Sequence, residues 1–537
     1  MSATDLFTAR SELLSKIERK EALEWDVIVV GGGITGAGVL REAARRGYRV
    51  LLLEQQDFAW GTSSRSSKMV HGGLRYLASG DFKLTQHSLQ ERERILREAP
   101  GLSERMGYYY VLRKGKFPGR IAMSLVLALY DRIAGIKDHR FVKPNKLAKV
   151  FPGLCDHKLQ GACYYTDAVT DDSRLVMRVL QEATIDGGCA LNYARASNLL
   201  FEGDKVVGLK VEVADLNEAI ELRAPVVINA TGAWADRLRG ELGKAARVRP
   251  LRGSHLVLPR ERCPVDHVLA LQHPTDGRAV FVFPWEGTTV IGTTDLDHSE
   301  DLDIEASISA EEITYLLDII NKQFPSHTVT VADVISSWSG VRPVIGADKA
   351  VDASKERRDH AVWSDNGLVT VSGGKLTTFR LIALDALRVA EHLLPARNSS
   401  DTATDDRVFR AAPSQPQAGN SECAHAEKIR ARFGTCAAQV IANAQAIELE
   451  CIAGTSFSLA ECRWAIKHES VRHLDDLMLR RTRLGQVLPN GGDAILDELK
   501  AMFTAMLGWN ELQWQQEVDR YKTIWQRYYS LPVSNNG

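Results

Sequence analysis

The sequence lacks several features that would place it in a common class. Its longest apolar run, residues 121–130, falls well short of the roughly 20 residues needed to cross a bilayer. Its eight cysteines form no CxxC pair, which argues against a zinc site or a redox disulfide and fits a reducing compartment. The first 24 residues lack the continuous apolar stretch of a signal peptide. We therefore expect a cytoplasmic chain that spans no membrane and binds no metal.

The chain also lacks an excess of charge of either sign. Lys plus Arg number 67 and Asp plus Glu number 68, so there is no broad positive field to attract nucleic acid. The 537 residues and their 45% hydrophobic content leave room for two or three domains with a large core. Nucleic acid is not an expected partner.

One βαβ unit is evident near the start of the chain. Residues 26–30 form a short run of β-branched residues, typical of a buried parallel strand, and residues 50–53 form a second one. Between them, residues 35–46 have the pattern of a helix that Gly47 closes. The sequence therefore predicts a Rossmann-like domain of the α/β class.

Later segments predict the rest of the organisation. Short alternating runs between residues 256 and 295 indicate an antiparallel sheet, and residues 173–183 indicate a helix capped by Asp171 or Asp172. We expect five parts: a helical extension (1–24), a cofactor-binding domain (25–397) interleaved with a substrate domain (about 100–160 and 246–340), a linker (398–421) and an all-helical C-terminal domain (422–537).

A glycine pattern lies at the turn of the βαβ unit. Gly31, Gly33 and Gly36 give GxGxxG between strand and helix, a spacing that lets a pyrophosphate approach the helix N-terminus. Glu54 ends the second strand, where it would accept hydrogen bonds from a ribose hydroxyl and disfavour a 2′-phosphate. The motif disfavours NADP but leaves both FAD and NAD open.

Two later stretches favour FAD. NATGAWAD (229–236) returns a strand to a turn of small residues, and GLVTVSGGKLTTFR (367–380) combines a strand, a Gly-Gly turn and a helix start. A helix N-terminus would stabilise the charge that an isoalloxazine ring gains on reduction, and Lys375 would add a full positive charge. We therefore expect cofactor contacts from Ala230, Gly232, Gly373, Gly374, Lys375, Leu376 and Thr377.

These motifs carry a family resemblance. GGGITGAG, TSSRSSKMVHGGLRYL, RGSH, GTTD, SGVRP and GGKLTTFR occur in the order found in FAD-dependent glycerol-3-phosphate dehydrogenases. The chain resembles the respiratory, membrane-associated type of the D-amino-acid-oxidase-like superfamily from Asp26 onward. It departs from the pattern at Phe379, where a tyrosine is expected, and in its first 24 residues, which extend beyond the usual start.

The resemblance implies roles for the polar run after the second strand. Flavin contacts are expected from Thr62, Ser63, Ser64, Ser67 and Lys68, while substrate contacts are expected from His71, Arg75 and Tyr76. The alternative for the serines is a hydroxyl-capped turn without a ligand. The alternative for Arg75 and Tyr76 is the start of a surface helix.

The implied reaction is oxidation of the C2 alcohol of sn-glycerol 3-phosphate to dihydroxyacetone phosphate, with hydride transfer to FAD. Arg342 in SGVRP is the expected phosphate anchor, because a guanidinium binds phosphate oxygens bidentately. Arg75 and Lys375 would share that charge, and Arg252 would lie nearby. His255 in RGSH is favoured over His71 as the base, since an imidazole titrates near working pH.

Residues 114–137 bear on the electron acceptor. An apolar stretch there has basic residues on both flanks, as in a helix that lies in an anionic membrane interface and gives electrons to a quinone. This favours peripheral association with the cytoplasmic face of the membrane. The alternative for the segment is a buried helix of the substrate domain.

Other readings of the whole chain remain open on the sequence alone. They are a soluble glycerol-3-phosphate oxidase that uses oxygen, a non-catalytic flavin-binding protein and, more weakly, an amine oxidase of similar fold. A homodimer is also left open.

Overall fold

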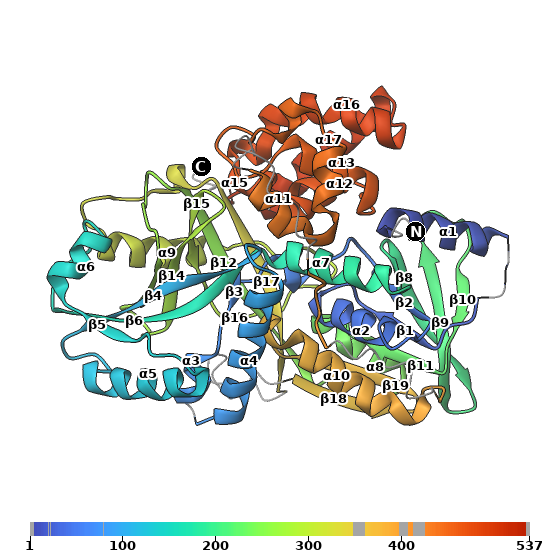
Figure 1. The fold of residues 1–537 in the computed structure, drawn as a ribbon, viewed down its shortest axis with the longest axis horizontal. Helices are drawn as coiled ribbons and strands as arrows, with labels where there is room; N and C mark the ends of the chain where they lie inside the picture. The colour runs from blue at the N-terminus through green and yellow to red at the C-terminus, as the bar shows by residue number, and fades with distance from the viewer. Residues whose placement is uncertain are drawn as a thin grey trace.

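The computed structural model describes residues 5–19, 21, 23–78, 80–346, 360–396, 406–411 and 425–532. In Figure 1 two large sheets lie side by side, and the helices of the C-terminal part sit above the region where the sheets meet. The mixed α/β class with a helical C-terminal domain is therefore confirmed.

The first sheet contains the predicted βαβ unit. Its strands run in the order β18 (His360–Asp365), β19 (Leu368–Gly373), β11 (Val226–Asn229), β1 (Val27–Val30), β2 (Val50–Leu53) and β7 (Cys189–Leu191). The five strands from β19 to β7 pair in parallel, and β18 is antiparallel to β19. Strands β1 and β2 are fully buried, so their runs of Val, Ile and Leu follow from apolar contacts on both faces.

Helices cover one face of this sheet, and a smaller sheet covers the other. Helix α2 (Ile34–Ala44) packs against α7 (Asp172–Ile185) and α10 (Phe379–Ala390) in one hydrophobic cluster. On the opposite side, the antiparallel strands β8 (Ala194–Glu202), β9 (Lys205–Val213) and β10 (Ile220–Arg223) share a core with α1 (Leu6–Glu18). The N-terminal segment thus forms the expected helix, which packs through Leu13 and Leu14.

The second large sheet has ten strands, and several neighbours in the sheet are not consecutive in the sequence. The path is β16 (Leu296–Asp297), β12 (Val248–Pro259), β15 (Thr288–Gly292), β14 (Ala279–Trp285), β13 (Val268–Gln272), β4 (Ser103–Arg113), β6 (Leu159–Thr170) and β3 (Met69–Val70), with β17 (Ser336–Ile345) on β12 and β5 (Arg140–Val142) on β6. All pairs are antiparallel except β13 with β4. The sheet therefore extends beyond the predicted segments and reaches back to residues 69–70.

Helices border this second sheet and its link to the first. They are α3 (Leu74–Ala78), α4 (Phe82–Glu98), α5 (Arg120–Ala134), α6 (Pro144–Val150) and α9 (Ala310–Gln323). Among the described helices, none is both long and apolar enough to cross a bilayer.

The C-terminal part is helical, as predicted. Its longer helices are α11 (Ala426–Phe433), α12 (Ala437–Ala442), α13 (Leu459–His468), α16 (Leu496–Leu507) and α17 (Glu511–Tyr528). One hydrophobic cluster joins Leu474 and Leu477 of this part to Trp285 and Trp338 of the second sheet. The C-terminal domain is therefore packed onto the second large sheet. Most of the predicted linker lies outside the described residues.

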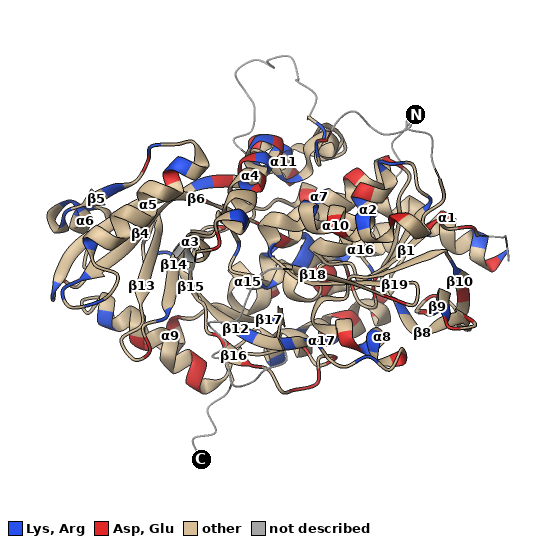
Figure 2. Ribbon diagram, turned by 90° about the horizontal axis from the view of Figure 1, so that it is seen from below, with Lys and Arg blue, Asp and Glu red and all other residues tan. Residues whose placement is uncertain are grey.

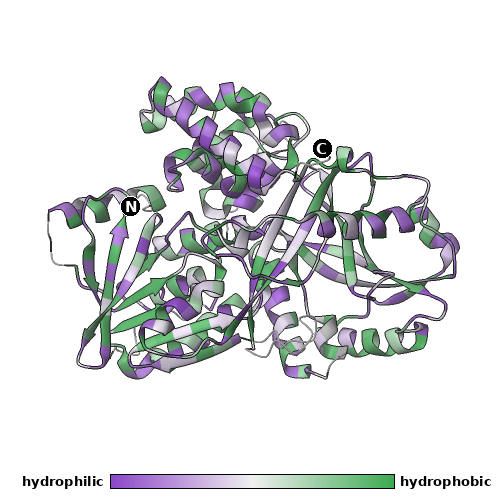
Figure 3. Ribbon diagram, turned by 180° about the vertical axis from the view of Figure 1, so that it is seen from behind, coloured by the Kyte–Doolittle hydropathy of each residue, from purple (hydrophilic) through white to green (hydrophobic). Residues whose placement is uncertain are grey.

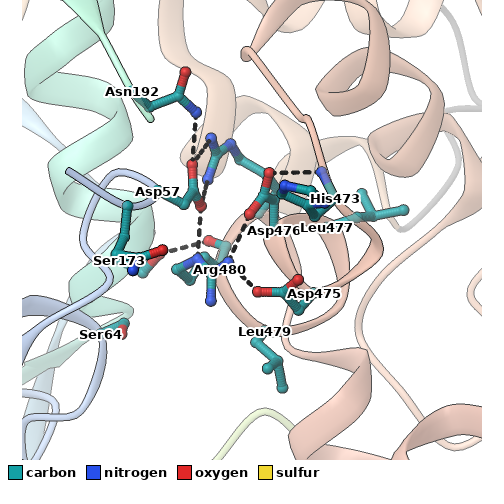
Figure 4. A network of polar contacts seen from close by, with 12 residues as sticks. Asp57, Ser64, Ser173, Asn192, His473, Asp475, Asp476, Leu477, Leu479 and Arg480 are labelled. Atoms are coloured by element: carbon teal, nitrogen blue, oxygen red, sulfur yellow. Dashed lines mark hydrogen bonds and ion pairs between the residues drawn. The ribbon is translucent and has the colours of Figure 1, made fainter. Parts of the chain in front are cut away.

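Buried ion pairs also attach the C-terminal domain to the first sheet. Asp57, which follows β2, accepts from Arg480 Nε at 2.6 Å and from Arg481 Nη1 at 2.7 Å, and all three side chains are fully buried. Figure 4 shows Arg480 also reaching Asp475 and Asp476 in its own domain. A buried charge needs such partners, so this network couples the two parts energetically.

Charges of both signs are mixed over the described surface. Figure 2 shows Lys and Arg interspersed with Asp and Glu on the helices and loops of both halves. This distribution agrees with the nearly equal numbers of basic and acidic residues.

Candidate active site

The turn between β1 and α2 has the shape of a dinucleotide-binding loop. Gly33 is the N-cap of α2, and the helix N-terminus faces the loop. A Cβ at Gly36 would lie 1.8 Å from the Gly31 carbonyl oxygen, so only glycine permits this packing of helix on strand. The geometry of this turn is the one that the glycine spacing predicts.

A cleft of about 1430 Å³ of empty volume, partly open to solvent, runs from this turn along the edge of the first sheet. Many residues that the sequence assigned to the cofactor line it, namely Gly31, Gly33, Glu54, Thr62, Ser63, Ala230, Gly232, Gly373, Gly374, Lys375 and Leu376.

Other residues line the cleft that sequence reasoning did not assign. They include Gln55, Trp60, Ser66, Arg195, Thr231, Trp234, Arg237 and Pro343. Trp234 lies in the NATGAWAD stretch and Pro343 follows Arg342, so adjacency to a chosen motif could have found both. Arg195 belongs to a strand of the small sheet and carries no local signal of its own.

The carboxyl group of Glu54 is held against the glycine turn. Its oxygens accept from the backbone N–H of Gly32 at 2.6 Å and of Gln56 at 2.9 Å. Burial raises the pKa of this carboxyl to about 7. The end of β2 therefore presents a carboxyl group to the cleft, in the place where a ribose hydroxyl is expected.

The polar run at residues 62–68 divides between the cleft and the interior. Ser63 Oγ accepts from the N–H of Ile34 at the start of α2, at 3.0 Å, and Thr62 Oγ1 donates to the Val341 carbonyl. Ser63 and Thr62 therefore join the glycine turn to β17. Ser64 is buried beneath them, and its hydroxyl faces the Gly61 carbonyl at 3.5 Å.

Lys68 does not reach the cleft. Its fully buried ammonium donates to Asp172 Oδ1 at 2.8 Å and to the Ser64 carbonyl at 2.6 Å. The reason is that α7 begins at Asp172 directly beneath the run, and a buried carboxylate requires a cation. Asp172 also accepts from the N–H and the hydroxyl of Ser66, and Ser66 lines the cleft. The structure thus corrects the predicted position of Lys68.

Ser67 points to the predicted base. Its hydroxyl lies 2.9 Å from Nε2 of His255, a residue of β12. The imidazole is fully buried and stacks on Trp338, with ring centroids 4.9 Å apart. Nδ1 is buried and has no hydrogen-bond partner among the described residues.

The electrostatic environment keeps His255 neutral. Burial lowers its pKa well below the ordinary histidine value, and the nearby charges of Arg342 and Lys68 lower it further. An imidazole of this kind has a free lone pair at neutral pH and accepts a proton without first losing one.

Arg342 lies on β17 beside this histidine. Its Nη1 donates to Asp295 Oδ1 at 3.0 Å and its Nη2 to Thr293 Oγ1 at 3.0 Å, while 23% of the side chain is exposed. The GTTD and SGVRP motifs therefore meet here. Arg252 is turned to Glu312 at 3.1 Å and lies away from this contact.

A second group of predicted residues surrounds Lys375. The Lys375 ammonium lies 3.6 Å from the ring centroid of Tyr76 and donates to Ser88 Oγ at 2.8 Å. His71 lies 6.4 Å from Tyr76, ring to ring, and its backbone N–H donates to Thr377 Oγ1. A cationic side chain and two aromatic rings thus gather at this end of the cleft, which Lys375 lines.

Two further residues that the sequence singles out are Arg75 and Phe379. Arg75 lies in α3, and its side chain falls outside the described part of the structure. Phe379, where the resemblance expects tyrosine, is buried against Gly38 of α2 and belongs to the hydrophobic core.

Comparison with protein families supports the division of the chain. Residues 26–380 match the family model described as FAD dependent oxidoreductase. Residues 397–513 match the model described as the C-terminal domain of alpha-glycerophosphate oxidase.

Curated relatives cover almost the whole chain. "Glycerol-3-phosphate dehydrogenase 2" of Mycobacterium tuberculosis is 34% identical over 518 residues, which is 93% of this chain and 87% of the relative. "Aerobic glycerol-3-phosphate dehydrogenase" of Bacillus subtilis is 36% identical over 393 residues, or 72% of this chain and 68% of the relative.

Solved structures share the fold. The glycerol-3-phosphate dehydrogenase of Bacillus halodurans complexed with FAD superposes with a TM-score of 0.73 over 97% of this chain and 98% of that one, at 23% identity. L-alpha-glycerophosphate oxidase of Mycoplasma pneumoniae with FAD bound gives 0.57 over 73% and 100%, at 17% identity.

Proposed function

This chain belongs to the FAD-dependent glycerol-3-phosphate dehydrogenases, and from that premise we propose that it oxidises sn-glycerol 3-phosphate to dihydroxyacetone phosphate. The observation that carries the proposal is the proximity of a partly exposed guanidinium, Arg342, to a neutral imidazole, His255, next to the cleft-lining residue Pro343. FAD supplies the hydride acceptor when it is bound. The side chains around it must bind a phosphate and remove one proton.

The cleft fits FAD in its donors and its shape. The glycine turn and the N-terminus of α2 would hold the pyrophosphate, and Glu54 would hold the ribose. The Gly373–Gly374–Lys375 turn would face the ring, where the Lys375 ammonium stabilises added negative charge. The family and the donor set therefore agree on FAD and not NAD.

Arg342 and His255 would divide the work on the substrate. The guanidinium would bind phosphate oxygens bidentately, with Asp295 and Thr293 fixing its orientation. A phosphate dianion at Arg342 would offset the positive charge that depresses the pKa of His255, making the imidazole a stronger base when substrate is present. His255 would then take the C2 hydroxyl proton as hydride leaves.

Glu54 makes FAD binding depend on pH. In the FAD-free protein its carboxyl has a pKa of about 7, above the ordinary value of about 4.3, so it is half protonated at neutral pH. That shift stabilises the FAD-free fold at low pH, and the stabilisation is lost as the pH rises through 7. FAD binding instead favours the ionised form, which accepts from the ribose.

We therefore expect the affinity for FAD to fall below pH 7, by up to about tenfold per pH unit, and to level off above pH 8. Fluorescence titration of the FAD-free protein between pH 5.5 and 8.5 measures this. Glu54→Gln should bind FAD more weakly at pH 8 and with little pH dependence. An unchanged pH profile in this variant would remove Glu54 from the ribose site.

Replacement of Arg342 tests the phosphate anchor. Arg342→Met should raise KM for sn-glycerol 3-phosphate by about 10- to 100-fold, because one charge-assisted contact to phosphate contributes about 1.5 to 3 kcal/mol. Arg342→Lys keeps the charge but not the bidentate geometry, so its KM should lie between that of the parent and that of Arg342→Met. Steady-state rates with a soluble dye acceptor measure both.

Arg252→Met is the matched control, since Arg252 lies on the neighbouring strand but pairs with Glu312. Its KM should stay within a few-fold of the parent. If Arg342→Met loses bound FAD, as read from the flavin absorbance, then Arg342 supports the cofactor and not the substrate.

Helix α5 bears on the electron acceptor. Phe117, Ile121, Leu125 and Leu129 recur every four residues and are 83%, 78%, 68% and 37% exposed. The opposite face of α5 packs Met123, Leu127 and Tyr130 into the core. The helix is thus apolar on two faces; Figure 3 shows it at the lower right, at the edge of the molecule.

We propose that the exposed face of α5 binds the cytoplasmic surface of the membrane and that a quinone there accepts the electrons. The flanking Lys114, Lys116, Arg120, Arg132 and Lys137 are all exposed. Apolar insertion with basic flanks is the pattern of helices that lie in an anionic interface, at about 1 kcal/mol per basic residue near the surface.

Leu125→Ser with Leu129→Ser should shift most of the protein from the membrane to the soluble fraction and depress quinone reduction at least tenfold. A soluble dye should still be reduced at near the parent rate. Sedimentation with anionic vesicles and the two acceptor assays measure these effects.

Ile447→Ser with Leu512→Ser is the matched control, because these side chains are 64% and 67% exposed in the C-terminal domain. This pair should leave vesicle binding unchanged. If the parent protein turns over with oxygen alone as fast as with quinone, then oxygen and not quinone is the electron acceptor. Loss of dye and quinone activity together would make α5 a structural helix only.

A further inference from the structure

Three side chains of the C-terminal domain form a chain of contacts outside the cofactor cleft. Cys451 Sγ lies 3.2 Å from Nδ1 of His425, and Nε2 of His425 lies 2.8 Å from Oε2 of Glu461. A nucleophile, a base and a carboxylate that orients the base follow one another in this order. Such an order is the structural signature of an activated nucleophile.

The carboxylate fixes which nitrogen of His425 faces the sulfur. Arg432 and His425 lower the pKa of Glu461 to about 2 although burial opposes them, so Glu461 is ionised and can only accept a hydrogen bond. Nε2 of His425 must therefore carry its proton toward Glu461. In the neutral ring, Nδ1 then has a lone pair directed at the thiol of Cys451.

The carboxylate is itself held in place. Its second oxygen, Oε1, accepts from Arg432 Nη1 at 2.9 Å, and Oε2 also accepts from the Ser458 N–H at 2.9 Å. Arg432 is shared with Glu286, from the turn between β14 and β15, at 2.7 Å. Arg432 and the Ser458 N–H thus fix the carboxylate of Glu461 beside His425.

Exposure distinguishes residue Cys451 from the other cysteines described. Cys451 is exposed, whereas Cys163, Cys263 and Cys462 are buried and Cys155, Cys189 and Cys436 are intermediate. Burial raises the pKa of the Cys436 thiol to about 11 and of Cys263 to about 12, so these thiols are unreactive at neutral pH.

We propose that Cys451 is a reactive thiolate, activated by His425 and Glu461, and that it is a modification site for hydroperoxides. The thiol proton passes to His425 Nδ1, giving a thiolate and an imidazolium. The sulfur then attacks one oxygen of hydrogen peroxide, so that an S–O bond forms and the O–O bond breaks. Sulfur loses two electrons, the peroxide is reduced, and the proton on His425 converts the leaving hydroxide to water. The product is a sulfenic acid at Cys451.

The first test is the rate of alkylation of the intact holoenzyme by iodoacetamide, with the modified residue identified by peptide mass spectrometry. An ordinary exposed thiol slows about 50-fold between pH 8.5 and pH 6.5, because it ionises near pH 8.5. Cys451 should slow less than fivefold over this range. His425→Asn should restore the ordinary pH dependence and lower the rate at pH 6.5 at least tenfold.

Glu461 gives an independent variant. Glu461→Gln should move the pH profile partway to the ordinary one, since its amide accepts from Nε2 without a charge. Thermal denaturation shows whether each variant is folded, and Arg463→Gln, on the same helix but paired with Glu448, is the control that should leave alkylation unchanged. An ordinary pH profile for the parent Cys451, or no effect of folded His425→Asn, overturns the proposal.

The second test is the reaction with hydrogen peroxide at micromolar concentration. Dimedone, which traps sulfenic acids, should label Cys451 before the other cysteines, and Cys451→Ser should abolish that first label. The same variant should oxidise glycerol 3-phosphate at the parent rate, so this test is separate from the proposed function. Uniform labelling of all cysteines, or labelling that persists in Cys451→Ser, would contradict a specific site.

Discussion

Replacement of His255 by asparagine is expected to slow reduction of the bound flavin by sn-glycerol 3-phosphate by about 10²- to 10⁴-fold, the usual range for a lost general base. The asparagine amide can still bond Ser67, which now lies 2.9 Å from Nε2, so the fold around Trp338 should persist. FAD content and substrate affinity should stay within a few-fold of the parent, because the cleft is lined by other residues. Stopped-flow absorbance under anaerobic conditions measures the rate.

The pH profile separates a base from a structural residue. Because the pKa of His255 is held well below the ordinary value, the parent rate should be flat through neutral pH and fall only in acid. His71→Asn is the matched control, and it should cost less than about tenfold if His71 only flanks Tyr76. A loss below tenfold in His255→Asn together with a large loss in His71→Asn would reassign the base to His71.

Removal of the Asp57 carboxylate is expected to be the most destabilising single change considered. Asp57→Ala leaves the buried guanidinium of Arg481 without its nearest carboxylate and removes one of the three carboxylates that pair with Arg480. Breaking a buried ion pair in this way costs about 3 to 5 kcal/mol of stability. Because Asp57 follows β2, the loss should also loosen the cofactor domain and lower FAD retention.

Thermal denaturation followed by both flavin fluorescence and circular dichroism measures this effect. Glu202→Ala is the matched control, because it breaks an ion pair to Arg223 whose side chains are 71% and 56% exposed. Such a pair contributes about 0 to 1 kcal/mol. Equal melting temperatures for the two variants would show that the network in Figure 4 does not couple the domains.

The parts of the fold that depend on local pattern could be predicted from the sequence. Strands β1 and β2 are short apolar runs, and Gly31 and Gly36 are required by contacts of under 3 Å that no Cβ could make. Likewise, α7 starts with Asp171 as its N-cap, which accepts from the Arg174 N–H. Each of these signals is contained within a few residues.

The parts that depend on distant partners could not be predicted. The polar run around Lys68 predicts a cofactor contact. Its ammonium instead donates to Asp172, which lies 104 positions later in the sequence. Arg195 reaches the cleft because β8 folds over the end of β2, which no motif records. The same holds for the contacts of His425 with Cys451 and Glu461, which lie 26 and 36 positions from it in the sequence.

Helix α5 shows where composition alone is ambiguous. Its apolar residues were consistent with a buried helix and with an interfacial one, since hydropathy does not say which face is covered. The structure divides them by position: Leu127 is fully buried, while Leu125 is 68% exposed. One face of α5 is therefore buried and the other is exposed, so the helix has features of both a buried helix and an interfacial one.

The most direct test of the account is anaerobic titration of the purified yellow protein with sn-glycerol 3-phosphate and, separately, with glycerol. The account predicts that the flavin absorbance near 450 nm bleaches with the phosphate ester, at one equivalent of substrate per flavin, and that dihydroxyacetone phosphate is formed. Glycerol should bleach it at least 100-fold more slowly, because the phosphate that Arg342 is proposed to hold is missing. Equal bleaching by both alcohols, or no bleaching by the phosphate ester, would contradict the account.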